Sequence, residues 1–379
     1  MVSAPTILLN GELAMNTIGL YIHIPFCKSK CPYCDFFSRR GSELEYDRYV
    51  AETLKKIVYW SNLCGKKVAS IYFGGGTPSV IGAKRLCTLL NKAKEHFKVL
   101  DNAEITCEVN PESGKIIDFD LMKAAGFNRI SVGLQSAVEN ELKALGRIHT
   151  AEEAKITAKR SVEAGIDNIS FDLMMGIPYQ TLETLKQSIS FCAECNVTHI
   201  SSYLLKVEKG TKFYTMRDKL PLSDDDIQAD LYLNAVTELE KLGYEQYEIS
   251  NFAKPGFEGR HNINYWKCGE YIGIGPSAHS FFDGKRFYYG RSMQDYFERK
   301  IVDDGAGGDI QEYIMLALRL KEGLNFKDFE NRYSLPVPAA TMKKIRNFEK
   351  HGFMELDENH ACFTKKGFLV SNSILSELI

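Results

Sequence analysis

Six short apolar runs alternate with amphipathic helical patterns along the first two thirds of the chain, and this alternation most constrains the fold. The runs are rich in β-branched and aromatic residues and lie at 19–24, 68–73, 103–109, 129–135, 168–174 and 199–205. Continuous apolar runs are typical of strands buried on both faces of a parallel sheet. The helical patterns between and after them lie at 47–60, 83–97, 120–126, 151–165, 181–195 and 226–243. Several end at a glycine, the residue that most often closes a helix in the left-handed conformation: Gly126, Gly165 and Gly243.

Repeated strand–helix units predict an α/β fold, either an open doubly wound sheet or a barrel. The six units are two fewer than a full barrel contains, so we expect an incomplete (β/α)6 barrel of the TIM type. Its site should lie at the carboxyl ends of the strands. The expected organisation is an N-terminal extension at 1–14, a partial barrel at 15–254, a linker segment rich in Gly and aromatic residues at 255–305 and a C-terminal domain at 306–379.

The C-terminal domain has a pattern of its own. Helical patterns at 312–321, 326–333 and 340–352 precede a hairpin pattern at 353–364 and a last helix at 366–378. This order resembles a winged-helix module. Its third helix is basic, through Lys343, Lys344, Arg346 and Lys350, which raises DNA binding as an alternative. The net charge of −2 favours a solvated helix face instead, so we expect no nucleic-acid partner.

The cysteine content and the apolar stretches restrict the cellular setting. No apolar stretch approaches the roughly 18 residues that a spanning helix requires, so we expect no transmembrane segment, although peripheral membrane contact is compatible with the sequence. Residues 1–14 lack the basic start and the cleavage site of a signal peptide. Ten cysteines without such a signal are typical of thiols in a reducing compartment. We therefore expect a cytoplasmic protein whose cysteines are available for metal or cluster ligation.

Three cysteines form a C-x3-C-x2-C pattern directly after the first predicted strand: Cys27, Cys31 and Cys34. A zinc site normally needs four ligands, and no fourth cysteine lies nearby in the sequence. Three thiolates suit a [4Fe–4S] cluster in which each holds one iron, and zinc is the alternative. The remaining iron is then open to a ligand from outside the protein. S-adenosylmethionine, a radical source, carries an amino group and a carboxylate that can chelate it.

The segment YIHIPFCKSKCPYCDF resembles the cluster motif of the radical SAM family, with Tyr33 as the aromatic residue before the third cysteine. The resemblance implies that the reduced cluster cleaves S-adenosylmethionine to methionine and a 5′-deoxyadenosyl radical. A glycine run in YFGGGTPS follows the second predicted strand, and glycine lets a backbone approach a ligand closely. No Gly-Lys-Ser/Thr follows it, which excludes a phosphate-binding P-loop. In radical SAM proteins this position meets the methionyl amino group, so the resemblance implies cofactor contacts at Gly75, Gly76, Thr77 and Pro78.

Polar residues interrupt or end the later apolar strands. Glu108, Gln135 and Asp172 lie at such positions, and Arg147 follows the fourth unit. A buried carboxylate without a partner costs several kcal/mol, a cost that a bound ligand or a position at the barrel mouth avoids. An arginine can bind a carboxylate through two hydrogen bonds. Resemblance to the porphyrin-related branch of the family implies cofactor contacts at Tyr21, Glu108, Gln135, Arg147 and Asp172. The alternative for each is an internal salt-bridge layer.

Eight motifs across about residues 19–320 resemble the branch that contains anaerobic coproporphyrinogen oxidases and HemW-type heme chaperones. They are YIHIPFCKSKCPYC, FGGGTPS, EVNPE, ISVGLQS, LGRIHT, FDLMMGIP, YEISNFA and GIGPSAHS. Two marks favour the chaperones. Phe36 stands where the oxidase motif has a further cysteine, and HNINYW at 261–266 matches the chaperone signature HNxxYW. Imidazole is a normal axial ligand of heme iron, and rings such as Tyr265 and Trp266 can stack on the macrocycle, so the resemblance implies heme contact at His261.

The resemblance implies a heme chaperone that carries a [4Fe–4S] cluster and S-adenosylmethionine and transfers heme to respiratory heme proteins such as cytochromes. The alternative is an oxygen-independent coproporphyrinogen III oxidase (dehydrogenase), which converts coproporphyrinogen III to protoporphyrinogen IX by radical chemistry. A DNA-binding regulator that uses the cluster as a sensor is a third class. The sequence assigns no catalytic residue, and it leaves open whether the protein turns over a substrate.

Overall fold

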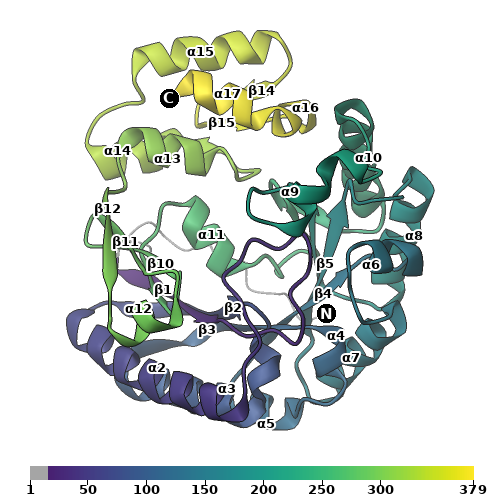
Figure 1. Ribbon diagram of the computed structural model, residues 1–379. Coiled ribbons are helices and arrows are strands. Elements are labelled where there is room, and N and C mark those ends of the chain that lie inside the picture. The colour runs from purple at the N-terminus through teal and green to yellow at the C-terminus, as the bar shows by residue number, and fades with distance from the viewer. Residues whose placement is uncertain (1–15) are drawn as a thin grey trace, which may run out of the picture.

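Six parallel strands form the centre of the fold in the computed structural model, which describes residues 16–379 (Figure 1). They pair in chain order and are β1 (Thr17–Ile24), β2 (Lys67–Gly75), β3 (Lys98–Val109), β4 (Arg129–Gln135), β5 (Asn168–Met175) and β6 (His199–Leu204). The larger helices that cover their outer face are α2 (Glu43–Leu63), α3 (Ala83–His96), α5 (Phe119–Ala125), α7 (Ala151–Glu163), α8 (Leu182–Glu194) and α10 (Asp225–Lys241). The sheet is curved but not closed, which confirms the incomplete (β/α)6 barrel.

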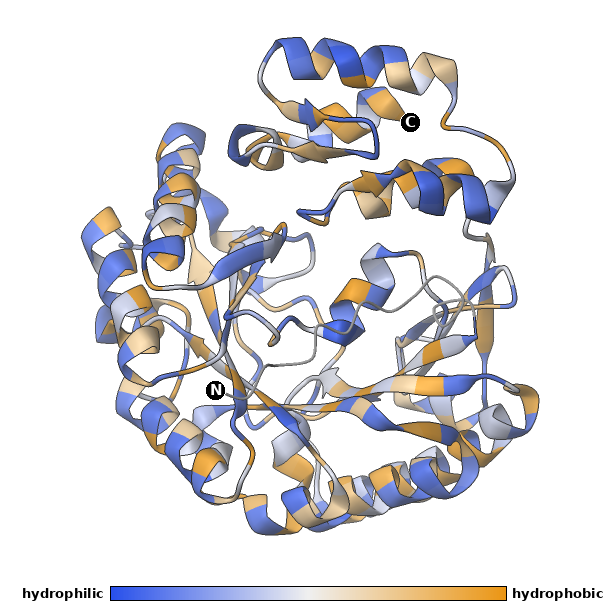
Figure 2. Ribbon diagram, turned by 180° about the vertical axis from the view of Figure 1, so that it is seen from behind, coloured by the Kyte–Doolittle hydropathy of each residue, from blue (hydrophilic) through white to orange (hydrophobic). Residues whose placement is uncertain are grey.

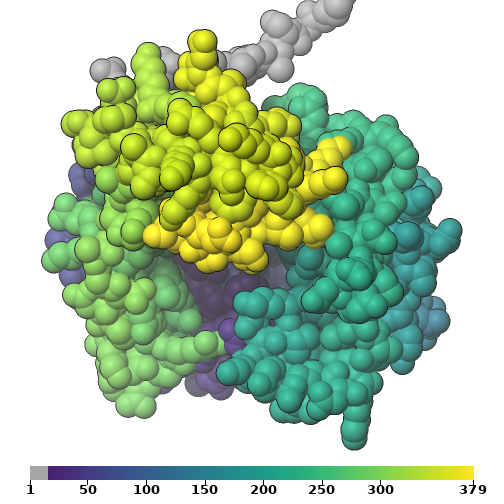
Figure 3. All heavy atoms as spheres, turned by 90° about the horizontal axis from the view of Figure 1, so that it is seen from above, coloured from purple at the N-terminus to yellow at the C-terminus, as the bar shows by residue number. Residues whose placement is uncertain are grey.

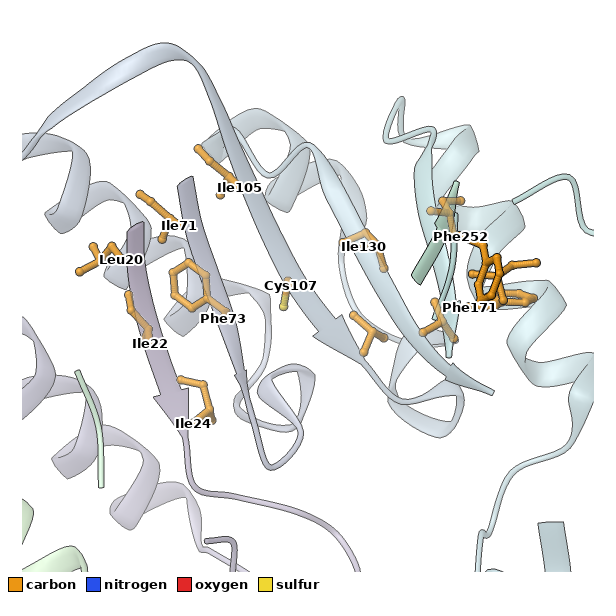
Figure 4. Close-up of a cluster of buried hydrophobic side chains, with 14 of the residues drawn as sticks. Leu20, Ile22, Ile24, Ile71, Phe73, Ile105, Cys107, Ile130, Phe171 and Phe252 are labelled. Atoms are coloured by element: carbon orange, nitrogen blue, oxygen red, sulfur yellow. The ribbon is translucent and has the colours of Figure 1, made fainter. Parts of the chain in front are cut away.

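The two faces of the central strands differ in chemistry. Side chains on the face covered by the helices are apolar and fully buried, as Leu20, Ile22, Ile71 and Phe73 illustrate (Figure 4). Burial of each such side chain stabilises the fold by roughly 1.5–3 kcal/mol. Side chains on the inner face are largely polar and bond to one another, among them Tyr21, His23, Tyr72, Glu108, Ser131 and Asp172. The strands in Figure 2 are accordingly mostly apolar in colour, with hydrophilic residues interspersed. The inner face is therefore lined by a network of hydrogen-bonded polar side chains rather than by a packed apolar core.

Local sequence signals set the helix ends. The side chain of Ser42 accepts a hydrogen bond from the backbone of Glu45 at the start of α2, and the Glu45 carboxylate accepts one from the backbone of Ser42. The same reciprocal cap, with Thr150 and Glu153, begins α7. The glycines predicted to close helices have positive φ values of +110° at Gly126, +83° at Gly165 and +82° at Gly243. These conformations confirm the helix ends expected from the sequence.

The central sheet continues on both sides with strands that the sequence analysis did not predict. Beyond β6 lie β8 (Asn251–Ala253) and β7 (Glu245–Glu248). On the other side, β9 (Tyr271–Ile274) pairs with β1 in parallel, and β10 (His279–Phe282), β11 (Lys285–Tyr289) and β12 (Ile301–Ala306) follow in antiparallel order. Residues 255–305, expected as a linker segment, thus supply four strands and the helices α11 (Arg260–Trp266) and α12 (Met293–Phe297). The four strands hold only four to six residues each, too few for a clear period.

The C-terminal region has the predicted order of helices and hairpin. It comprises α13 (Ile310–Ala317), β13 (Leu324–Asn325), α14 (Phe326–Tyr333), α15 (Ala339–Lys350), β14 (Met354–Leu356), β15 (His360–Phe363), α16 (Lys365–Leu369) and α17 (Ser371–Leu378). The single last helix expected at 366–378 is divided at Val370. Arg286 of β11 forms an ion pair with Glu312 of α13, and Lys365 bonds Glu240 of α10. The region therefore contacts both sides of the curved sheet, above its open end in Figure 1.

Short elements complete the described chain: η1 (Pro78–Ile81), α4 (Pro111–Gly114), α6 (Glu139–Ala144), α9 (Lys212–Met216) and η2 (Arg217–Lys219). Among residues 16–379, no helix combines the length and the apolar character needed to cross a bilayer. The extension predicted at residues 1–14 lies outside the described part of the chain.

Candidate functional site

The three-cysteine loop follows β1 and folds back on its own start. The backbone N–H of Cys27 donates to the carbonyl of Arg39 at 3.0 Å, and the N–H of Arg39 donates to the carbonyl of Pro25 at 2.9 Å. Within the loop, the N–H of Cys34 donates to the carbonyl of Cys31 at 3.1 Å. These bonds close the loop at its base, so that its three half-buried cysteines share one compact segment at the carboxyl end of β1.

Two further contacts fix the loop against distant parts of the chain. The Tyr33 ring lies 6.1 Å from that of Phe213, centroid to centroid, and joins a small apolar cluster that includes Leu145 and Met174. On its other side, the Arg291 guanidinium donates to the carbonyl of Asp35 at 2.5 Å and to its carboxylate at 3.0 Å. Tyr33, predicted from the family motif as a cofactor contact, therefore has a clear anchoring role in this geometry.

Two polar side chains approach the cysteine sulfurs. The Thr77 hydroxyl donates to Sγ of Cys27 at 3.5 Å, and Nη1 of Arg147 lies 3.6 Å from Sγ of Cys31. Burial raises the pKa of the Cys27 thiol, against the lowering effect of the Thr77 hydrogen bond, and burial raises the pKa of Cys34 to about 11. Iron binds thiolate, so cluster assembly must release these protons.

The structure shows no site for a single metal ion among its described residues: no three His, Cys, Asp or Glu side chains converge to hold one. A [4Fe–4S] cluster makes a different demand, since each of its cysteines binds a separate iron.

The glycine run at the end of β2 packs closely against the cysteine loop. The N–H of Gly76 donates to the carbonyl of Ile24 at 2.8 Å, and the N–H of Thr77 donates to that of Phe26 at 2.7 Å. A Cβ at Gly75, whose φ is +107°, would lie 2.5 Å from the His23 ring, and one at Gly76 would lie 2.6 Å from the Phe26 carbonyl. Close packing thus requires both glycines. Pro78, the fourth residue predicted here, is buried at the start of η1.

Glu108 and Asp172 form a pair of partly buried carboxyl groups on the inner face. Glu108 accepts a hydrogen bond from the Tyr72 hydroxyl at 2.9 Å and one from the N–H of Gly75 at 3.2 Å. Asp172 accepts one from the Ser131 hydroxyl at 3.0 Å. Burial, and then repulsion by Asp172, raises the pKa of Glu108 to about 7, and burial raises the pKa of Asp172 to about 6. A cationic ligand beside them would relieve this repulsion.

Arg147 joins the cysteine loop to the ends of three strands. Its Nη2 donates to Oδ1 of Asn110 at 2.9 Å and to the carbonyl of Gly133 at 2.8 Å, while Nη1 approaches Cys31. Asn110 in turn donates to the Thr77 hydroxyl at 3.0 Å. Asn110 was not among the predicted site residues, although its position inside the EVNPE motif was a signal. The structure thus brings Thr77, Asn110 and Arg147 into one hydrogen-bonded chain between two cysteines.

Gln135 combines an unfavourable backbone conformation with a side-chain oxygen that has no hydrogen-bond partner. It ends β4 with a φ of +69°, a left-handed conformation that is strained for glutamine. Its side chain is 8% exposed, and Oε1 finds no hydrogen-bond partner within residues 16–379. A buried amide oxygen left unpaired in strained backbone indicates a place for a ligand that donates a hydrogen bond.

Tyr21 connects the inner face to the cysteine loop through His23, which the sequence analysis did not single out. The Tyr21 hydroxyl bonds Nδ1 of His23 at 3.0 Å, and Nε2 of His23 bonds the carbonyl of Phe37 at 2.9 Å. Burial lowers the pKa of His23 to about 4, so the imidazole is neutral at pH 7.

His261 lies inside the curved sheet, at the start of α11. Its side chain is 2% exposed, Nδ1 bonds the Ser70 hydroxyl at 2.8 Å, and Nε2 bonds the Tyr265 hydroxyl at 2.7 Å. The ring stacks on Tyr72 with centroids 5.1 Å apart, and the backbone N–H groups of Arg260 and His261 donate to the Glu104 carboxylate. Both ring nitrogens are therefore engaged in this conformation.

The raised pKa of Glu108 predicts a pH effect on stability in the absence of ligand. Since folded Glu108 titrates near pH 7 and an ordinary glutamate near 4.5, its proton is held more tightly in the folded protein, and its contribution to stability falls as pH rises between these values. Glu108→Gln should therefore gain stability relative to wild type from pH 5 to 7.5, by at most about 1.4 kcal/mol per pH unit. Denaturant unfolding at several pH values measures the difference. The exposed Glu183→Gln is the control, and parallel curves for Glu108→Gln and wild type would contradict the expected burial.

The chain is similar to proteins of known family along most of its length. Residues 21–192 match the radical SAM superfamily, and residues 309–370 match the HemN C-terminal domain. The heme chaperone HemW of Haemophilus influenzae is 40% identical over 94% of this chain and 97% of its own length. That of Escherichia coli is 41% identical over 71% of this chain and 72% of its own.

Among solved structures, the coproporphyrinogen III oxidase HemN of Escherichia coli, a radical SAM enzyme, superposes with a TM-score of 0.81. The match covers 97% of this chain and 92% of that one, at 22% identity, and it supports the fold alone.

Proposed function

The chain belongs to the HemW family of radical SAM proteins, and from this premise we propose that it is a heme chaperone that binds heme and passes it to heme proteins of the respiratory chain. The observation that carries the proposal is the 40% identity with a heme chaperone over 94% of the chain. Phe36 in place of a further cysteine and the HNINYW segment agree with this proposal rather than with coproporphyrinogen oxidation.

Membership of the radical SAM family implies a [4Fe–4S] cluster and S-adenosylmethionine. When bound, they supply an electron and a source of radicals. We assign the cluster to Cys27, Cys31 and Cys34. The donor set suits it, because three half-buried thiols share one closed loop and a guanidinium lies beside one of them.

The residues around the loop suit S-adenosylmethionine as a ligand. The carboxyl groups of Glu108 and Asp172 would be stabilised by a cation between them, and the Gln135 side-chain oxygen lacks a hydrogen-bond donor. Arg147 places a positive charge beside Cys31, one of the proposed cluster ligands. The ammonium, carboxylate and sulfonium groups of the cofactor can meet these needs. The proposed contacts are Tyr21, Gly75, Gly76, Thr77, Pro78, Glu108, Gln135, Arg147 and Asp172, with Tyr33 holding the loop in place.

Heme is proposed as the cargo, with the segment His261–Trp266 near it. The hydrogen bonds of His261 to Ser70 and Tyr265 engage both ring nitrogens, so iron ligation by this residue requires one of these hydrogen bonds to break. The C-terminal domain, which contacts both sides of the sheet, is a candidate cover for the porphyrin or contact for the acceptor. We place the protein in the cytoplasm, with respiratory cytochromes as acceptors and no nucleic-acid partner.

Transfer of heme to membranes that contain heme-depleted cytochromes tests the proposal. The protein, reconstituted anaerobically and loaded with heme, is mixed with such membranes, and reduced-minus-oxidised spectra follow cytochrome formation. We expect cytochrome bands to grow as heme leaves the protein, faster than with the same heme on serum albumin. Retention of heme by the protein, or equal delivery from albumin, would count against chaperone function.

A further inference from the structure

The histidines of the chain differ sharply in whether a ring nitrogen is available to bind iron. Four of the eight lie on or beside the inner face, are at most 4% exposed and have both ring nitrogens hydrogen-bonded. They are His23, His149, His199 and His261. An axial ligand of heme needs an imidazole nitrogen with a free lone pair. In the described conformation none of these four offers one.

Three of the remaining histidines lie away from the inner face. His96 ends α3 in the outer helix layer, 3.6 Å from Glu95. His351 and His360 belong to the C-terminal domain, where Nδ1 of each bonds a neighbouring oxygen. His279 is the exception: it is exposed, and no hydrogen bond or ion pair to its imidazole is found within residues 16–379.

The backbone geometry places His279 on the inner side of the sheet. Gly273 of β9 pairs with Tyr21 of β1, and a Cβ built on Gly273 would collide with the carbonyl oxygen of His279. The chain at the start of β10 therefore crosses the inner face of β9, next to a predicted cofactor residue. Side chains alternate along β10, so His279 and Phe281 point to the same face of the sheet. Phe281 pairs with Tyr271, and Tyr271 pairs with Gly19, where a Cβ would point to the inner face. His279 therefore also points to the inner face.

The neighbouring strand supports the same orientation. Tyr289 of β11 points outward, because its hydroxyl accepts a hydrogen bond from Trp60 of α2 at 2.8 Å. Tyr288, the residue before it, must then point inward. Its ring stacks on His279 with centroids 4.7 Å apart and an angle of 23° between the planes. The imidazole and the phenol thus present two parallel aromatic groups on the inner face.

We propose that His279 is an axial ligand of heme iron in this conformation, with Tyr288 holding its ring in place, while His261 stabilises the inner face of the barrel. This inference rests on the proposed heme-binding function. Desolvation lowers the pKa of His279, so its imidazole is neutral and its lone pair is available at pH 7.

The surroundings of His279 suit a large flat ligand. Arg291, three residues after Tyr288, bonds Asp35 of the cysteine loop, and the adjacent Phe36 is 65% exposed. An exposed aromatic side chain next to the loop offers apolar surface to a macrocycle. Figure 3 shows the molecule hollowed between the C-terminal domain, the light green segment around β10–β12 and the teal middle of the chain. N-terminal residues, in purple, lie at the bottom of this hollow.

Heme titration of wild type, His279→Ala and His261→Ala tests the assignment, with the surface variant His351→Ala as the matched control. We expect His279→Ala to lose the Soret spectrum of histidine-ligated heme and to bind at least about tenfold more weakly. Free imidazole, added to this variant, should restore the spectrum. His261→Ala empties a buried position, so its melting temperature should fall, and circular dichroism establishes whether it is folded.

Two results would overturn the assignment in distinguishable ways. If wild type shows no saturable heme binding, the proposed function fails, and the ligand assignment fails with it. If wild type binds heme and His279→Ala retains its affinity and spectrum, only the ligand assignment is wrong. Loss of the spectrum in folded His261→Ala but not in His279→Ala would identify His261 as the ligand instead.

Discussion

Replacing Cys27, Cys31 and Cys34 together by alanine should abolish cluster formation, with a loss of about four iron atoms per chain. The physical reason is that these are the only three cysteines in the closed loop after β1, and each is assigned to bind a separate iron of the cluster. S-adenosylmethionine cleavage should be lost as well. Iron and sulfide assays after anaerobic reconstitution, with the visible absorption spectrum, measure the effect.

The control for this experiment is a variant that removes two half-buried cysteines outside the loop, Cys64→Ala with Cys195→Ala. It should assemble the cluster as wild type does. Iron retained by the triple variant would contradict the assignment of the ligands. One zinc per chain in wild type prepared without oxygen would contradict the cluster itself.

Arg147→Ala should weaken S-adenosylmethionine binding on the order of a hundredfold, equal to about 2.8 kcal/mol. Nη1 of the guanidinium lies 3.6 Å from Sγ of Cys31, and the same group bonds Asn110 and the Gly133 carbonyl. Its removal withdraws a charged donor from the proposed cofactor site and leaves those two partners unpaired, at a cost to folding of roughly 1–3 kcal/mol. Isothermal titration of the reconstituted protein measures binding, and thermal unfolding measures the structural part.

Two further variants separate charge from geometry at Arg147. Arg147→Lys keeps the charge but lacks the planar fork that reaches several partners, so its affinity should be intermediate. Asn110→Ala breaks the link between Thr77 and Arg147 while leaving the guanidinium, and its effect should be smaller. Wild-type affinity in a folded Arg147→Ala protein would exclude the residue from the cofactor site.

The sequence predicts the part of the fold that is encoded locally. Five of the six central strands begin and end close to the predicted positions because each is a continuous apolar run, and the helices between them carry caps and closing glycines. The exception is β3, which begins at Lys98, five residues before the predicted start at 103, because its first residues are mostly exposed and show no apolar run. The polar inner face was only partly foreseen, through Glu108, Gln135 and Asp172. Strands β9 to β12 were missed because each holds only four to six residues, and because β9 joins the sheet through pairing with β1, a contact distant in sequence that no short period reveals.

The candidate site also has a part that the local sequence predicts and a part that only the tertiary structure reveals. The cysteine pattern is recognisable because its spacing is short, and the structure adds what spacing cannot show. Asn110 joins Thr77 to Arg147 only because three strand ends meet. The HNINYW motif identifies His261 but not the hydrogen bonds with Ser70 and Tyr265 that occupy both of its ring nitrogens. The GIGPSAHS motif likewise contains His279 but does not reveal its environment. His279 is exposed and stacks on Tyr288 because the start of β10 crosses the inner face of β9.

Heme binding and coproporphyrinogen turnover, measured side by side on one anaerobic preparation that holds the cluster and S-adenosylmethionine, distinguish a heme chaperone from an oxidase. We expect saturable heme binding at about one heme per chain, as for a single axial site. We also expect coproporphyrinogen III to keep its propionate groups, as mass spectrometry would show. Loss of these groups with release of carbon dioxide, in a protein that does not bind heme saturably, would contradict the account.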